Sequence, residues 1–167
     1  MKQVAPLLAF LLALSSCLSR PPISKQSCKL TMSWTADQTF HPDERRAIET
    51  AMDIWTAGTE GRACFYEGGQ DIRFIRVQQQ RDLCPFDPGC MNHVGLHTAG
   101  RIWLVVGEML SERYMVATTV HEIGHAMSLS HQESGCMTRV INEGCIGAGR
   151  LSPADLRTFC EKWGCAK

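Results

Sequence analysis

Two stretches of the chain alternate apolar and polar residues, which is the pattern of a half-buried β-strand. Residues 29–34 have an apolar side chain at every second position, and residues 71–77 begin in the same way with Ile72 and Phe74 and continue with a further apolar pair. Two further segments, 94–97 and 101–106, flank the turn sequence Thr-Ala-Gly at 98–100. They predict a β-hairpin that follows the second strand.

Three other segments have helical spacing and recognisable ends. One helix begins at Pro42, with two acidic residues in its first turn, and ends at Gly58. Residues 111–127 have the length and spacing of a second helix. A third helix begins after Ser152, an N-cap residue followed by proline, and runs to about Trp163. These strands and helices predict one mixed domain without an internal repeat.

Composition agrees with a single exported globular domain. The chain has 167 residues, of which 44% are hydrophobic and 20% charged, and this length suits one domain. Its 17 basic residues balance 17 acidic ones. That balance argues against nucleic acid as a partner, because nucleic-acid binding needs a basic surface. No apolar run reaches the roughly 18 residues that a spanning helix requires.

The first residues have the features of an export signal. Lys2 precedes an apolar run over 4–14, and residues 14–17 read Leu-Ser-Ser-Cys. This sequence resembles a bacterial lipobox, which implies cleavage after residue 16 and lipidation of Cys17. We therefore expect a signal peptide at 1–16, a lipidated tether at 17–28 and a membrane anchor, with Leu18 favouring the outer membrane. The alternative is an ordinary secretory signal that is cleaved slightly later.

The nine cysteines fit an oxidising compartment. If Cys17 carries lipid, eight remain, an even number that allows four disulfides. The candidates are Cys28, Cys64, Cys84, Cys90, Cys136, Cys145, Cys160 and Cys165. Their short spacing makes Cys84–Cys90 and Cys136–Cys145 the expected local pairs.

Candidate chemistry lies in the sequence HEIGHAMSLSH at residues 121–131. On a helix, His121 and His125 are one turn apart, so both imidazoles can bind one metal ion. If the chain turns back after the helix, His131 supplies a third ligand. Three protein ligands and one open position are typical of a catalytic Zn²⁺, which lowers the pKa of a water molecule. Glu122 would then act as general base and pass the proton to the leaving amine. Alternatives are a chance pattern on a solvated helix and a zinc site without catalysis.

The same residues resemble the extended zinc motif of the metzincin metalloendopeptidases, H-E-x-x-H-x-x-G-x-x-H. The resemblance implies an α+β zincin-like fold: a twisted mixed sheet, long helices and an active-site cleft. It also implies a catalytic domain at 29–167 whose small C-terminal subdomain starts at about residue 129. Met137 fits the methionine that lies beneath the metal in a tight turn, the Met-turn. Ser128 replaces the motif glycine at a position where the chain turns sharply, and serine adopts that conformation at some cost.

Within the metzincins the chain is most similar to matrixins. The similarity lies in the order of its elements and in the sequences around its first and last helices. Astacins and serralysins carry a tyrosine just after the Met-turn, whereas this chain has Thr138 and Arg139 there. That difference weighs against both branches.

His93 and His97 allow a second interpretation. Their spacing is that of a metal-binding pair on a helix, but the surrounding turn residues predict a strand, with both histidines exposed. Residues 94–97 are a candidate edge strand that pairs with an extended peptide substrate.

The sequence therefore predicts a zinc metalloendopeptidase that is exported, lipid-anchored and monomeric. Its expected partners are a protein or peptide substrate and, through the anchor, a membrane. Three alternatives remain: a zinc-bearing lipoprotein that binds peptides without cutting them, a disulfide-rich surface protein with an accidental motif, and a variant zinc site that uses Glu143 instead of His131.

Overall fold

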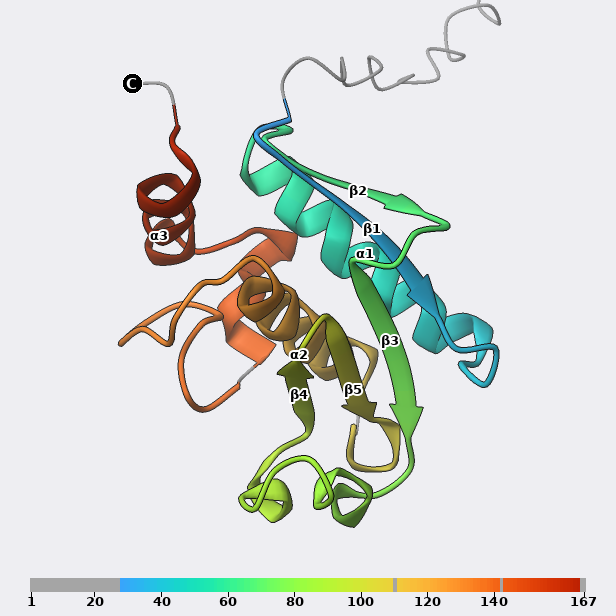
Figure 1. Ribbon diagram of the computed structural model, residues 1–167. Helices are drawn as coiled ribbons and strands as arrows, with labels where there is room; N and C mark the ends of the chain where they lie inside the picture. The colour runs from blue at the N-terminus through green and yellow to red at the C-terminus, as the bar shows by residue number, and fades with distance from the viewer. Residues whose placement is uncertain (1–27, 110, 142, 166–167) are drawn as a thin grey trace, which may run out of the picture.

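The computed structural model describes residues 28–109, 111–141 and 143–165 (Figure 1). A single five-stranded sheet has the order β2-β1-β3-β5-β4. Its strands are β1 (Leu30–Ala36), β2 (Ala63–Glu67), β3 (Ile72–Val77), β4 (Gly95–Thr98) and β5 (Arg101–Val105). Within these residues the chain also forms three α-helices, α1 (Pro42–Gly58), α2 (Glu112–Ala126) and α3 (Pro153–Trp163), besides short 3-10 helices. The mixed α+β architecture expected from the sequence is confirmed.

The sheet is mixed, as expected. Strand β1 runs parallel to β2 and β3, and β3 runs parallel to β5. Strand β4 is antiparallel to β5 and forms one edge of the sheet, which confirms the predicted hairpin. The opposite edge, β2, was missed by the pattern reading. Its five residues, ACFYE, do not alternate between apolar and polar. The Cys28–Cys64 disulfide links β2 to the residues just before β1 and so supports their pairing.

The main core lies between one face of the sheet and the helices α1 and α2. Its buried residues include Ile72, Phe74, Ile102 and Leu104 from the central strands, together with the apolar faces of both helices. Helix α1 begins as predicted, where the backbone N–H of His41 donates to Glu44 Oε2 at 2.8 Å. It buries the stripe that the sequence indicated, which comprises Ile48, Ala51, Met52 and Trp55.

The opposite face of the sheet has a smaller core of its own. Trp103 and Val105 project there and are covered by Leu83 and Cys90. Phe86, from the loop closed by the Cys84–Cys90 disulfide, stacks on Trp103 with ring centroids 4.8 Å apart. This loop leads directly into β4, so the disulfide braces the approach to the edge strand.

The chain after α2 is mostly irregular and is held by covalent links. It contains one 3-10 helix, η5 (Glu143–Gly149), and the closing helix α3. The expected disulfides Cys84–Cys90 and Cys136–Cys145 are present, and Cys160–Cys165 links the end of α3 to the residues that follow it. Each bridge contributes about 2–4 kcal/mol to a chain of this kind.

The expected signal peptide at 1–16 and the lipidation site Cys17 lie outside the described residues, as does the tether except for Cys28. Among the residues that the structure describes, no helix is both long and apolar enough to cross a bilayer.

Candidate metal centre

The last turns of α2 carry the candidate ligands into the interior. The helix begins at Ser111, whose Oγ accepts the backbone N–H of Tyr114 at 3.0 Å. It is anchored by Trp55, whose indole N–H donates to the carbonyl of Val120 at 2.9 Å. His121 therefore follows a residue that is fixed directly to α1.

A sharp turn after α2 brings the third histidine back. Ser128 has a left-handed backbone with φ 62°, which confirms the turn expected where the motif has glycine. The N–H of Ser128 donates to His125 O at 2.8 Å, and that of Leu129 donates to Gly124 O at 2.9 Å. These hydrogen bonds close the helix end and direct His131 toward the helix.

The three histidine side chains converge through their Nε2 atoms. His125 Nε2 lies 3.0 Å from His121 Nε2 and 3.2 Å from His131 Nε2. On the other side of two rings, Nδ1 of His121 is 2.6 Å from the carbonyl of Cys136, and Nδ1 of His125 is 2.9 Å from that of Leu129. A carbonyl only accepts, so each Nδ1 carries the proton and each Nε2 presents a lone pair to the cluster.

This donor set fits a Zn²⁺ ion. Zinc–imidazole bonds of about 2.05 Å in a tetrahedron place two nitrogens about 3.3 Å apart, close to both observed separations. Lone pairs that face one another at this distance repel unless a cation lies between them. Of all the residues described, only His121, His125 and His131 form a group of three or more side chains that could hold a metal.

Burial keeps the three histidines in the neutral form that can bind a metal. It lowers the pKa of His121 to about 4, against the opposing effect of the hydrogen bond to Cys136. Desolvation also lowers the pKa of His125 and His131. All three imidazoles are therefore neutral near pH 7, and few protons compete with a metal ion.

Glu122 is almost completely enclosed beside the cluster. Its exposed fraction is 4%, and this burial raises its pKa to about 8, although a hydrogen bond from the backbone N–H of His97 acts in the opposite direction. Strand β4 can approach this carboxylate because residue 95 is glycine. A Cβ at Gly95 would lie 2.7 Å from Glu122 Oε1 and 2.8 Å from Thr118 Cγ2.

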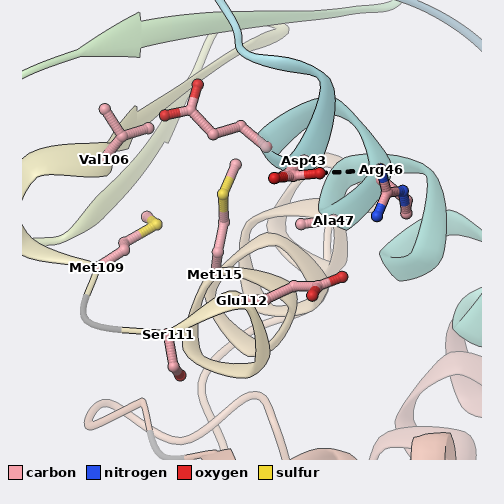
Figure 2. Close-up of a pocket in the computed structure, with 9 residues that line it drawn as sticks. Asp43, Arg46, Ala47, Val106, Met109, Ser111, Glu112 and Met115 are labelled. Atoms are coloured by element: carbon pink, nitrogen blue, oxygen red, sulfur yellow. Dashed lines mark hydrogen bonds and ion pairs between the residues drawn. The ribbon is translucent and has the colours of Figure 1, made fainter.

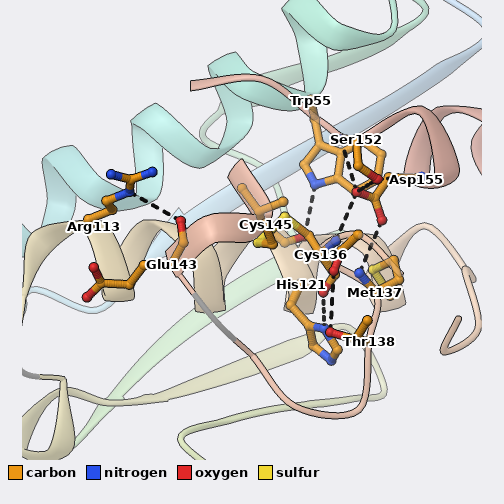
Figure 3. Close-up of a disulfide and its surroundings, with 12 residues drawn as sticks. Trp55, Arg113, His121, Cys136, Met137, Thr138, Glu143, Cys145, Ser152 and Asp155 are labelled. Carbon is orange, nitrogen blue, oxygen red and sulfur yellow. Dashed lines mark hydrogen bonds between the residues drawn. A yellow bond between two sulfur atoms is a disulfide. The ribbon is translucent and has the colours of Figure 1, made fainter. Parts of the chain in front are cut away.

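The segment behind His121 is held by a buried carboxylate that the sequence reading missed. Asp155 accepts the backbone N–H groups of Cys136 at 2.9 Å and Met137 at 3.1 Å (Figure 3). Its only signal in the sequence was its place in the first turn of α3, where it also accepts the Ser152 hydroxyl at 2.8 Å. Met137 itself is fully buried against Gly124, where any Cβ would collide with its sulfur.

Glu143 does not take part in the cluster. Its carboxylate accepts the hydroxyl of Ser111, and its carbonyl accepts Arg113 Nε–H at 3.2 Å. Ser111 lies ten residues before His121, about 15 Å along the helix axis. The alternative that used Glu143 as third ligand is therefore wrong.

The two remaining histidines near the cluster have different environments. His93 is partly exposed, and its Nε2 lies 3.1 Å from Asp87 Oδ2. His97 is half-buried in β4, and its pKa is lowered by burial and by the nearby charge of His125. The expected strand is present, but the expectation that His97 is exposed is wrong, because its strand packs against α2.

Two cavities show where ligands could approach. One lies directly beside the cluster and is lined by His131, Gln132, Glu133, Thr138, Arg139 and Val140. Figure 2 shows another, between the first turns of α1 and α2, with carboxylates and methionines on its wall. It contains no histidine, and its residues from α2 lie at the opposite end of the helix from His121.

Comparison with known families adds independent evidence. Residues 23–138 match the Astacin peptidase family, and no curated protein matches the chain. Thr138 and Arg139 argued against the astacin branch, and the family match shows that this inference is wrong. The expected similarity to matrixins is not confirmed. Thr138 is the last matched residue and Arg139 lies just beyond the match, which covers well over half of the chain. The chain belongs to the astacin family of zinc-dependent metallopeptidases.

Proposed function

We propose that this protein is a zinc endopeptidase in which His121, His125 and His131 bind the metal and Glu122 is the general base. The observation that carries the proposal is the convergence of three histidine Nε2 atoms next to one buried carboxylate. A purely structural zinc site would fill the fourth position with another protein ligand. No other potential ligand joins this group among the residues described.

Each residue has a defined role in peptide hydrolysis. When bound, zinc supplies a Lewis acid that polarises the scissile carbonyl and lowers the pKa of water. Glu122 takes the proton of the attacking water on its carboxylate and delivers it to the nitrogen of the leaving amine. Glu122 is buried beside the cluster, so bulk water is largely excluded from around this carboxylate. The carbonyl groups of Cys136 and Leu129 keep the imidazoles oriented throughout.

Strand β4 is the proposed docking site for the substrate backbone. It pairs with β5 on one side only and is the edge of the sheet. An extended peptide can add to such an edge through backbone hydrogen bonds. Gly95 and His97 bring this edge against Glu122, so a peptide bond held there would lie next to the general base.

The C-terminal part completes the proposed cleft. We assign a small subdomain to the chain from about residue 129, with Met137 in a Met-turn behind the ligand cluster. Its burial and its contact with Gly124 support this role. The cavity beside His131 would receive a substrate side chain.

The cellular setting is also a proposal. The lipobox-like sequence at 14–17 and the four disulfides support export, with a monomer anchored through Cys17 to a bacterial membrane. Substrates would then be extracytoplasmic proteins or peptides.

One preparation tests the function. The full chain with Cys17→Ser is purified from an oxidising compartment, analysed for metal and incubated with a denatured protein. One zinc per chain and chelator-sensitive cleavage would support the proposal. Zinc without cleavage would support a peptide-binding lipoprotein, and a folded chain without zinc would contradict both.

A further inference from the structure

The carbonyl that orients His121 belongs to a cysteine in a disulfide. Cys136 O lies 2.6 Å from His121 Nδ1, and Cys136 Sγ is bonded to Cys145 (Figure 3). The acceptor and the bridge thus share one residue, which is only 1% exposed. Any displacement of the bridge moves the acceptor with it.

Little regular backbone structure supports this carbonyl. No helix or strand includes residues 127–141, and the one β-bridge there joins Gln132 to Thr138. Asp155 fixes the N–H groups of Cys136 and Met137. These bonds act on the two amide groups, whereas the disulfide restrains the side of Cys136 that faces η5.

The far end of the bridge returns to the helix that carries the metal ligands. Cys145 lies in η5, whose first residue, Glu143, is bound to Arg113 and Ser111 at the start of α2. A closed path therefore runs from His121 through Cys136, Cys145 and Glu143 back to α2. The orientation of one ligand is tied to the opposite end of its own helix.

We propose that the Cys136–Cys145 disulfide is a positioning element of the metal site, which fixes the carbonyl that orients His121. The proposal rests on the zinc-binding role proposed above for His121. Outer hydrogen-bond partners of metal ligands typically change metal affinity by about 10–100-fold when they are lost. We expect the loss of this disulfide to weaken zinc binding about tenfold, at the lower end of that range, because Asp155 still holds the adjacent amides.

The chain offers a matched control. Cys84–Cys90 is another local bridge, with a sequence separation of 6 against 9, and it lies on the other face of the sheet. Zinc affinity is measured by chelator competition on the full chain for the wild type, C136A/C145A and C84A/C90A. The visible absorption of the cobalt(II)-loaded forms reports ligand geometry at full occupancy, which a general loss of stability does not change.

The expected result is weaker zinc binding and an altered cobalt spectrum in C136A/C145A, with both properties unchanged in C84A/C90A. Equal affinities and identical spectra in the two variants would overturn the proposal. If C136A/C145A does not fold, Arg113→Met decides, because it removes only an exposed contact to Glu143, about 12 Å along α2 from His121. Reduced zinc affinity in this variant supports the path, and wild-type affinity overturns it. Failure of the wild type to bind zinc would instead contradict the proposed function.

Discussion

Burying the carboxyl of Glu122 beside the three histidines lowers the free energy of unfolding of the metal-free protein. The size of this effect can be measured with Glu122→Gln. Burial raises the pKa of Glu122 from 4.5 to about 8. The folded-state pKa lies above the unfolded value. At a pH between the two, Glu122 is therefore protonated in the folded protein and ionised in the unfolded chain. The stability associated with that proton is fully present below the unfolded pKa and is lost as the pH rises toward the folded pKa.

The magnitude follows from the two pKa values. At pH 7 the unfolded chain gains about 3 kcal/mol from ionising this carboxyl, and at pH 5 it gains less than about 1 kcal/mol. Glutamine is neutral at every pH and retains an oxygen that can accept the His97 N–H. We therefore expect Glu122→Gln to stabilise the metal-free protein at pH 7 by about 2–3 kcal/mol, which corresponds to roughly 5–10 °C in Tm.

The assay is thermal unfolding of chelator-treated protein, followed by circular dichroism at pH 5 and pH 7. The advantage of Glu122→Gln should shrink at pH 5, and an exposed control, Glu161→Gln, should show no advantage at either pH. Equal Tm values for the wild type and Glu122→Gln at pH 7 would refute the reasoning, because the carboxylate would then be adequately solvated in the folded state.

Four further outcomes follow from the same geometry. Ser128→Gly should stabilise the protein by about 0.5–1 kcal/mol in denaturant titrations, because glycine adopts the left-handed conformation without strain; a loss of stability would contradict this. Gly95→Ala should reduce cleavage at least about tenfold with zinc still bound, because the added Cβ displaces β4 from Glu122; normal cleavage would show that this approach is not needed. Asp155→Ala should cost about 1–3 kcal/mol in denaturant titrations through two unpaired buried amides, and unchanged stability would refute their dependence on Asp155. Zinc at 100 times its Kd should stabilise the folded protein by about 2.7 kcal/mol, raising the Tm in differential scanning calorimetry, whereas a Tm unaffected by zinc would argue against a site formed only in the folded state.

Local features could be predicted from the sequence. The N-terminal ends of α1 and α3 could be predicted from Pro42 and Ser152, because capping and proline effects act within one helical turn. The convergence of His121 and His125 follows from helical spacing alone. The left-handed turn at Ser128 was expected only through the family motif, since serine by itself gives no such signal.

Features that depend on distant partners could not be predicted. Strand β2 forms against β1 across the Cys28–Cys64 bridge, and its own five residues carry little strand pattern. Asp155 reaches Cys136 across 19 residues, so it was identifiable only as the start of a helix. The burial of His97 depends on the packing of β4 against α2, which only the folded chain defines.

The branch of the metzincins could not be predicted from the residues after the expected Met-turn. Two residues, Thr138 and Arg139, weighed against the astacins, whereas the family match extends over residues 23–138. The tyrosine expected of that branch would supply one side chain near the metal, and this chain has Thr138 and Arg139 in that region. Family membership is thus carried by the distributed pattern rather than by one residue.

The central claim is that Glu122 performs the chemistry at a zinc ion held by three histidines. Its most direct test compares the cleavage of a denatured protein by the wild type and Glu122→Ala at equal, measured zinc content. We predict that the wild type cleaves, that a chelator stops it, and that Glu122→Ala binds one zinc but does not cleave. Cleavage by zinc-loaded Glu122→Ala at the wild-type rate would contradict the account.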